Sequence, residues 1–412
     1  MEIIALMFIA LTASFLLGEL FYKLKMPKVL GPIILGLIFA QKPLIGLIST
    51  GGTIEIFNFI KDIAIIFLMF FVGLKIDLRD FKKTSKRSFL VGLFASLIPF
   101  LLGFLAVVLI SKTGIFASFV SGSNIFLVAI VVGICLSITA EGVIIELLEE
   151  LNLIKSTIGE TVIEAGIIDD ILGILLISGL IAFIPGTSQS GEIGFVVLRK
   201  ILDMALFAGV IFIIGYFIVP KIMKLVEKEK STINFFAVSV MIILFLAMVT
   251  QFLDLGGSIL GSLFGGIIIR HTLLSGDKYE QKEEKSITDV IEVTTFGFFA
   301  PFFFIWIGLN VNLSILFEAP LITLLFVALG ISGKMIGSLL GNRLARGRMW
   351  EGFIIGWGMN IRSGVDIMIA TLALTAGIIS IDLFSVLIFM SFATTVISPI
   401  VFERLVKKHH GL

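Results

Sequence analysis

The chain has 412 residues, of which 58% are hydrophobic and only 15% are charged, and its mean hydropathy is +1.14. Soluble domains carry about 25% charged residues, so this composition excludes a soluble globular protein. The formal net charge of +1 excludes a general attraction to nucleic acid, and the single cysteine, Cys135, excludes an intrachain disulfide.

Continuous apolar runs of about 20 residues recur along the chain, and each can cross a hydrocarbon core of about 30 Å. Because the runs do not alternate with polar residues, they predict helices and not the strands of a barrel. No basic segment or cleavage site marks the first run as a signal peptide. We predict an all-α polytopic membrane protein, one transmembrane domain over 1–412, with the polar segment 275–286 as a loop. The thirteen predicted spans cover about 3–21, 29–48, 56–74, 88–110, 125–148, 157–184, 194–219, 233–253, 256–270, 289–309, 319–341, 350–376 and 382–403.

The positions of lysine and arginine predict the orientation. Of the 31 basic residues, 24 fall on one side of the predicted spans and 5 on the other, with Lys334 and Arg362 inside spans. The positive-inside rule places the richer side in the cytoplasm. We therefore predict a multi-pass protein of the cytoplasmic membrane, surrounded by lipid, with its N-terminus outside and its C-terminus inside.

Two spans carry polar residues at their centres, near 138–142 and near 360–364. We expect both to be discontinuous helices, because unwound backbone at membrane depth is tolerated where it lines a site. Acids are favoured at helix N-termini and cations at C-termini, which suits Glu141 and Asp366 after the breaks and Arg362 before one. The alternative is that small residues merely allow close packing. Spans 4–6 and 11–13 then resemble inverted repeats, a pattern typical of transporters.

The sixth span contains two adjacent acids, Asp169 and Asp170, in an otherwise apolar run. One ionised Asp at a helix centre costs roughly 2.5–3.5 kcal/mol on insertion scales, so such residues usually have a function. Lys334, in the eleventh span, needs a carboxylate partner, and either Asp is a candidate. Glu164 lies about 240° around the helix from Asp170, so a helix interface or dimer contact is as plausible for it as the site.

Hard oxygen ligands predominate among these buried polar residues, and such ligands suit a small hard cation such as Na⁺. The three histidines, His271, His409 and His410, lie at or beyond the predicted membrane edges. Without a convergent Cys or His set, we do not expect a transition-metal site.

Four motifs together resemble the monovalent cation/proton antiporters, most closely the NapA-like sodium/proton exchangers, over nearly the whole chain. They occur in order and at matching spans: Ile138-Thr139-Ala140, Ile168-Asp169-Asp170, Gly333-Lys334, and Gly358-Met359 followed by Arg362.

The resemblance implies a site and a mechanism. Asp170 is expected to carry the cation and the proton, Asp169 to pair with Lys334, and Thr139 to line the Na⁺ site, with Arg362 compensating charge. No cofactor is expected besides the transported Na⁺ and H⁺. A dimerisation subdomain (about 1–76 and 233–309) and an ion-translocation core (about 88–184 and 319–403), joined by a linker helix (about 194–219), are expected to form a homodimer. Exchange by elevator-like alternating access is expected to be electrogenic, because the first acid is Asp.

The chain departs from the family where relatives have Arg-Gly-Glu, because here Arg362-Ser363-Gly364 precedes Asp366. Further site residues are therefore considered: Glu141, Asp366, Ser137, Asn360 and Glu164. A potassium/proton antiporter of the same fold is the alternative function, and a passive channel is a weaker one. An intramembrane aspartyl protease is a distant alternative, since the two Asp are adjacent and no Gly-x-Gly-Asp motif occurs.

Overall fold

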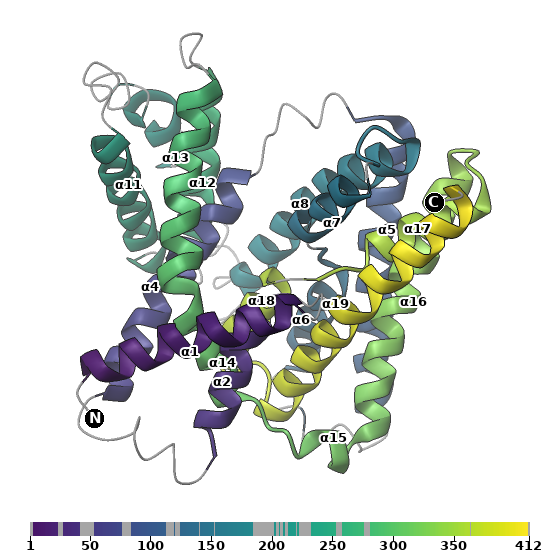
Figure 1. Cartoon of the computed structure of the whole chain (residues 1–412), viewed down its shortest axis with the longest axis horizontal. Coiled ribbons are helices and arrows are strands. Elements are labelled where there is room, and N and C mark those ends of the chain that lie inside the picture. The colour runs from purple at the N-terminus through teal and green to yellow at the C-terminus, as the bar shows by residue number, and fades with distance from the viewer. Residues whose placement is uncertain are drawn as a thin grey trace. The chain divides into compact units, whose positions relative to one another are not determined.

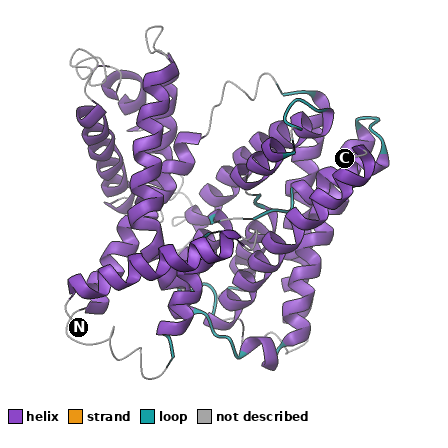
Figure 2. Ribbon diagram, in the orientation of Figure 1, coloured by secondary structure: helices purple, strands orange, loops and turns teal. Residues whose placement is uncertain are grey.

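In the computed structural model of the protein, the described residues are helical or lie in loops, with no strand among them (Figure 2). The described residues are 3–23, 28–41, 53–75, 84–112, 119, 124–139, 141–151, 153–183, 202, 206, 209–210, 213–219, 221, 232–252, 258–275, 281–362 and 364–410. The all-α prediction is thereby confirmed. Most of the predicted linker helix, 194–219, lies outside the described residues.

The chain divides into two compact units (Figure 1), one formed by Met1–Leu78 with Ile181–Leu309 and the other by Arg79–Leu180 with Asn310–Leu412. We call them unit 1 and unit 2. The roles predicted for the two halves, dimerisation and ion translocation, stay predictions.

Unit 1 contains the helices whose core is built from large apolar side chains, including Phe70, Ile243 and Ile269. Its elements are α1 (Ile3–Lys23), α2 (Leu30–Phe39), α4 (Thr53–Lys75), the π-helical turn η3 (Ile214–Ile218), α11 (Thr232–Phe252), α12 (Ser258–Ser275), α13 (Gln281–Thr294), the π-helical turn η4 (Thr295–Phe299) and α14 (Ala300–Asn310). The predicted loop 275–286 is partly helical, because α13 begins at Gln281. Its first turns are rich in Gln, Lys and Glu, which are good helix formers.

Unit 2 contains the two interrupted spans. Its elements are α5 (Lys86–Ser111), α6 (Ile125–Ser137), α7 (Glu141–Glu150), α8 (Thr157–Phe183), α15 (Ile315–Glu318), α16 (Pro320–Leu344), α17 (Met349–Gly358), α18 (Val365–Thr375) and α19 (Ile381–His410). The breaks between α6 and α7 and between α17 and α18 fall where the polar residues predicted them.

Seven of the described helices are long and apolar enough to cross a membrane. Shorter apolar helices add four more segments, among them α6 and α18, which are halves of interrupted spans. A half-helix is too short to span alone, so each broken pair has to serve as one crossing. The chain is accordingly a multi-pass membrane protein.

Glycines bring α5 against two neighbours, which positions the site. A Cβ at Gly337 of α16 would lie 2.3 Å from the Phe94 carbonyl oxygen of α5, and a Cβ at Gly341 or Gly333 would lie 2.4 Å or 2.7 Å from the nearest atom of α5. On another side of α5, a Cβ at Gly92 would lie 2.5 Å from the Ala165 carbonyl oxygen of α8. Small residues at such crossings let helix backbones approach within a membrane. Helix α5 therefore lies between the helix that carries the acids and the helix that carries Lys334.

Candidate cation site

The two helix breaks differ in how the backbone leaves the helix. Helix α6 ends at Ser137, and Ile138 is extended, with φ −73° and ψ 141°. Between α17 and α18, Gly364 has φ +86°, in the left-handed region that favours glycine. Helix α18 packs against both α6 and α19. The breaks therefore lie in one unit, where freed backbone groups can reach polar side chains.

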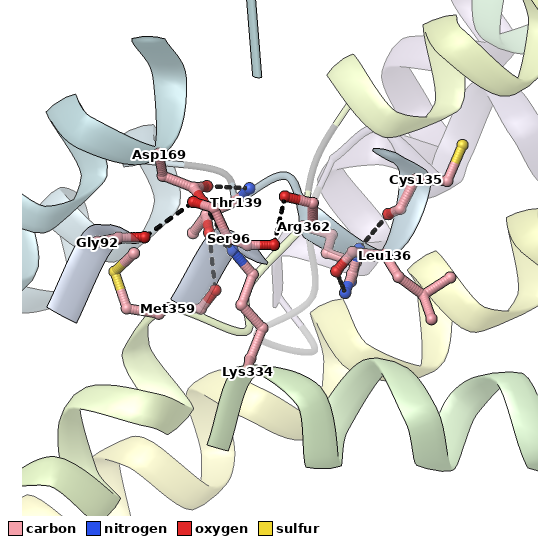
Figure 3. Close-up of polar contacts among 10 residues, drawn as sticks. Gly92, Ser96, Cys135, Leu136, Thr139, Asp169, Lys334, Met359 and Arg362 are labelled. Atoms are coloured by element: carbon pink, nitrogen blue, oxygen red, sulfur yellow. Dashed lines mark hydrogen bonds and ion pairs between the residues drawn. The ribbon is translucent and has the colours of Figure 1, made fainter. Parts of the chain in front are cut away.

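Asp169 on α8 is the centre of a buried hydrogen-bond cluster (Figure 3). Its Oδ2 accepts the backbone N–H of Thr139 at 2.8 Å, and its Oδ1 lies 3.0 Å from Nζ of Lys334. The Ser96 hydroxyl on α5 also contacts Oδ1. Three segments far apart in the sequence thus converge on one carboxylate, and each supplies a donor.

Thr139 links both breaks. Its hydroxyl accepts a hydrogen bond from Lys334 Nζ at 2.6 Å and donates one to the Met359 carbonyl oxygen at 2.9 Å. Met359 follows directly after α17. The side chain predicted to line the site therefore ties the unwound end of α6 to the unwound end of α17.

Lys334 is completely buried on α16 and Asp169 nearly so, with 0% and 1% of their side chains exposed. Removing one partner of a buried pair is strongly destabilising, by about 3–5 kcal/mol, because an uncompensated charge stays behind. The ion pair between Lys334 and Asp169 is therefore important for the stability of unit 2, and it is also a candidate for a role in the mechanism.

Asp170 differs from its neighbour in its surroundings. Its side chain is half-buried. Within the part of the chain that the structure describes, no residue makes a hydrogen bond or an ion pair with its carboxylate. Successive residues lie about 100° apart around a helix, so Asp170 does not face the donors that hold Asp169. Of the two acids, it is the one whose oxygens remain available to an ion or a proton.

Arg362 is fully buried in the break between α17 and α18, and it caps the other broken helix. Its guanidinium donates to the carbonyl oxygens of Cys135 and of Leu136, the latter at 2.6 Å (Figure 3). These carbonyls belong to the last turn of α6, where helix carbonyls lack intrahelical partners. Its charge thus neutralises the negative end of α6.

The further residues considered from the sequence lie in different places. Ser137 donates to the Ser96 carbonyl oxygen at 3.0 Å, which places it beside the cluster. Asn360 is buried and its amide contacts Ser398 on α19 at 3.1 Å. Asp366 is buried in the first turn of α18, four residues after Arg362. Glu164 accepts the backbone N–H of Ser85 at 3.0 Å, at the N-terminus of α5, which is a helix-interface role.

Three findings complete this placement. The side chain of Glu141 lies outside the described residues, although its backbone begins α7. Ser96 was not singled out by the sequence, since a lone hydroxyl in an apolar helix usually bonds to its own backbone. Among the described residues, no group of three or more His, Cys, Asp and Glu side chains could hold a metal ion.

A family model described as "Sodium/hydrogen exchanger, transmembrane" matches residues 7–408. The chain belongs to the sodium/hydrogen exchanger family. Members of this family are antiporters and not enzymes, so the protease alternative is set aside.

Relatives in this exchanger family cover the chain almost completely. The Na(+)/H(+) antiporter of Enterococcus hirae is 28% identical over 408 residues, which are 99% of each chain. The Na(+)/H(+)-K(+) antiporter GerN of Bacillus cereus is 27% identical over 94% of this chain and 92% of that protein. The K(+)/H(+) antiporter 1 of Saccharomyces cerevisiae is 29% identical over 92% of this chain and 43% of the yeast protein.

Among solved structures, the sodium proton antiporter MjNhaP1 from Methanocaldococcus jannaschii is similar over 98% of this chain and 96% of its own. The TM-score is 0.63 at 17% sequence identity. This similarity supports the antiporter fold. It does not identify the transported ions, which have to be inferred from the residues of the site.

Proposed function

We propose that this exchanger-family chain carries Na⁺ (or Li⁺) in exchange for H⁺ across the cytoplasmic membrane. Asp170 binds the transported cation and the proton in turn. Asp169, Lys334 and Thr139 shape the site beside it, and Arg362 balances charge at the crossed breaks.

The observation that carries this proposal is the difference between two adjacent acids. Asp169 accepts hydrogen bonds from Thr139 and Lys334 and contacts Ser96, whereas Asp170 has no hydrogen-bond or ion-pair partner among the described residues. A half-buried carboxylate without a partner is a hard oxygen ligand of the kind that Na⁺ prefers. It is also a proton acceptor. One set of oxygens can therefore hold either ion, but not both.

Competition for these oxygens makes the exchange obligatory. A proton that binds Asp170 displaces the cation, and a cation that binds displaces the proton. We take it that the site changes the side of the membrane to which it opens only when a cation or a proton is bound. Each change of side then carries the cation in one direction, and the return step carries the proton in the other. The cycle needs no ATP and no covalent step.

The decisive experiment is proton movement in liposomes that contain the purified protein, followed with a pH-sensitive dye after addition of Na⁺, Li⁺ or K⁺. Asp170→Asn should abolish exchange while the protein still elutes as a folded species. Glu164→Gln is the matched control, since it also changes an acid of α8 to an amide but lies at the Ser85 interface. Wild-type rates in Asp170→Asn would remove the basis of the proposal.

Potassium/proton exchange is the second candidate function. Two of the relatives carry K(+) in their names, and a half-buried carboxylate does not by itself discriminate between the two ions. The same liposome assay separates the candidates: proton release driven by Na⁺ and Li⁺ supports sodium exchange, and release driven by K⁺ alone supports the alternative.

We further propose that exchange is electrogenic, that unit 2 moves in an elevator-like manner, and that the chain works as a homodimer with its N-terminus outside. Electrogenicity depends on Asp169 and Lys334 changing partners during the cycle. Asp169→Asn should then retain some exchange with altered charge movement, measured with the membrane potential clamped and unclamped. Unchanged charge movement would contradict the Asp169–Lys334 exchange of partners.

A further inference from the structure

One face of helix α19 is polar, although the helix is apolar enough to cross a membrane. Ser391, Thr395 and Ser398 are spaced by four and three residues, so they lie on the same side of the helix. All three are buried. Helix α19 packs against α17 and against α18, the two halves of the second broken span. Its polar side chains can therefore reach the break between them, where backbone groups lack helical partners.

The Thr395 hydroxyl holds one carbonyl group of this break. Its Oγ1 lies 2.6 Å from the Arg362 carbonyl oxygen and 2.7 Å from the Ser391 carbonyl oxygen, and a hydroxyl has a single proton to donate. The Ser391 carbonyl lies within α19, where the backbone N–H one turn later already bonds to it. The Arg362 carbonyl accepts no backbone N–H within the described part of the chain. The proton is therefore needed at Arg362, because a buried carbonyl without a donor is costly.

The break is thus held from two sides. From the end of α6, the Thr139 hydroxyl donates to the Met359 carbonyl oxygen at 2.9 Å, and from α19, Thr395 donates to the Arg362 carbonyl. The Arg362 guanidinium reaches back to two carbonyl oxygens in the last turn of α6. Among the described residues, its Nε has no hydrogen-bond partner. The position of the guanidinium therefore depends on these two carbonyls and on the place where its own backbone is held.

We propose that Thr395 is a positioning residue for cation exchange. It holds the Arg362 backbone at the depth from which the guanidinium reaches the end of α6, and it thereby keeps Thr139, two residues beyond that end, in place beside the acids of α8. The inference rests on the proposed function, because it assigns Thr139 to the cation site. Thr395 is not assigned a contact with the transported ion.

The test measures exchange in liposomes against the concentration of the driving cation, which is Na⁺, or K⁺ if only K⁺ drives exchange. Thr395→Val replaces the hydroxyl with a methyl group of similar size, and Thr395→Ser retains a hydroxyl. Thr394→Val is the matched control at the next residue. Thr394 is also buried, but among the described residues its hydroxyl contacts only carbonyl oxygens of α19 itself, those of Met390 and Ser391.

Loss of the Thr395 donor leaves the Arg362 carbonyl unsatisfied and lets the break shift relative to the end of α6. We expect Thr395→Val to raise the cation concentration for half-maximal exchange by roughly fivefold, with a smaller change in the maximal rate, because the ligand geometry changes while the acids remain. Thr395→Ser and Thr394→Val should stay near wild type. The proposal is overturned if Thr394→Val raises this concentration as much as Thr395→Val, or if Thr395→Val leaves it unchanged.

A second measurement does not depend on transport. Unfolding midpoints of the detergent-solubilised protein with Thr395→Val and Arg362→Gln, alone and combined, form a double-mutant cycle. If Thr395 acts through Arg362, Thr395→Val should lower the midpoint less in the Arg362→Gln background than in wild type, whereas Thr394→Val should lower it equally in both. Strictly additive effects of Thr395→Val and Arg362→Gln contradict the positioning role. If the wild-type protein exchanges no ions, the proposed function fails, and this cycle alone decides the role of Thr395.

Discussion

At the scale of the residue, two acids that are neighbours in sequence have different surroundings because a helix turns about 100° between them. Asp169 accepts hydrogen bonds from α5, α16 and the end of α6, whereas the Asp170 carboxylate has no hydrogen-bond or ion-pair partner among the described residues. The sequence indicates that Lys334 needs an acid of the sixth span, and the structure selects Asp169.

The first prediction concerns the buried ion pair. Lys334→Ala leaves Asp169 as a buried carboxylate without its counter-charge, which should cost about 3–5 kcal/mol. We expect a large fall in the thermal unfolding midpoint of the detergent-solubilised protein. The double variant Lys334→Ala/Asp169→Asn removes both charges and should recover much of the loss. Strictly additive effects of the two substitutions would contradict an energetic coupling between the side chains.

A second prediction concerns the cap that Arg362 provides for α6. Arg362→Lys keeps the positive charge but cannot reach two carbonyl oxygens with a planar fork. We expect it to retain only part of the exchange activity and to be less stable, while Arg362→Gln should be worse in both respects. Exchange rates in liposomes and unfolding midpoints measure the two effects. Full activity of Arg362→Gln would show that the charge at the end of α6 is dispensable.

The sequence accounts for some of these residues and not for others. A lysine or an acid within an apolar span is conspicuous, because its cost demands a partner. The contact of Arg362 with the carbonyls of Cys135 and Leu136 joins positions more than two hundred residues apart, and it exists only once the two broken helices cross. Ser96 is inconspicuous for the opposite reason, since serine is tolerated in a helix through its bond to the preceding turn.

At the scale of the element, the glycines of α16 determine how deeply Lys334 enters the cluster. Gly333, Gly337 and Gly341 recur every four residues and bring α16 onto the backbone of α5 (Figure 1). The same helix carries Lys334 one position after the first of them. The same short segment of α16 therefore determines both the position of Lys334 in the cluster and the contact between α16 and α5.

The third prediction tests this contact. A Cβ at Gly337 would lie 2.3 Å from the Phe94 backbone oxygen, which cannot move without shifting α5. Gly337→Ala should lower stability by about 1–3 kcal/mol and reduce exchange. Gly330→Ala is the matched control on the same helix, since its Cβ would meet the flexible Met390 side chain at 3.2 Å. Equal unfolding midpoints for the two variants would contradict the proposed role of close contact.

Both helix breaks were predictable, because Gly and hydroxyl residues occur there together with charges. Three other features were not. The π-helical turns η3 and η4 each contain a glycine, Gly215 and Gly297, and the short helix α15 contains Glu318. Glycines occur in the continuous helix α16 as well, so these residues do not predict the irregular turns. Such irregularities depend on packing against neighbouring helices, which a single chain segment does not encode.

At the scale of the whole molecule, the sequence is a good guide because the membrane leaves few choices. Every backbone polar group must be satisfied within the helix or at a site, so long apolar runs predict helices, whereas the orientation indicated by the positive loops stays a prediction. What the sequence does not carry is the arrangement of unit 2, in which α5 lies between α8 and α16. That arrangement depends on contacts between segments from both halves of the chain.

The fourth prediction links the two ions through mass action. If protons and Na⁺ compete for the same oxygens, a tenfold rise in Na⁺ concentration should move the acid limb of the exchange–pH curve to lower pH. The expected shift is about one pH unit when each Na⁺ displaces one proton, and about half a pH unit when each Na⁺ displaces two protons together. The smaller shift is expected for an electrogenic exchanger. Dye assays at several Na⁺ concentrations measure it. A limb that does not move with Na⁺ would contradict shared oxygens.

One hydrogen-bond donor to Asp169 is insensitive to most amino-acid substitutions. The donor at position 139 is a main-chain N–H, and every amino acid except proline supplies one. Mutation can delete the Thr139 hydroxyl that meets Lys334 and Met359, yet the amide persists through almost any codon change. The hydrogen bond from this backbone N–H to the Asp169 carboxylate is therefore retained after almost any substitution at position 139. Thr139→Pro is the one substitution at this position that would remove hydroxyl and amide together.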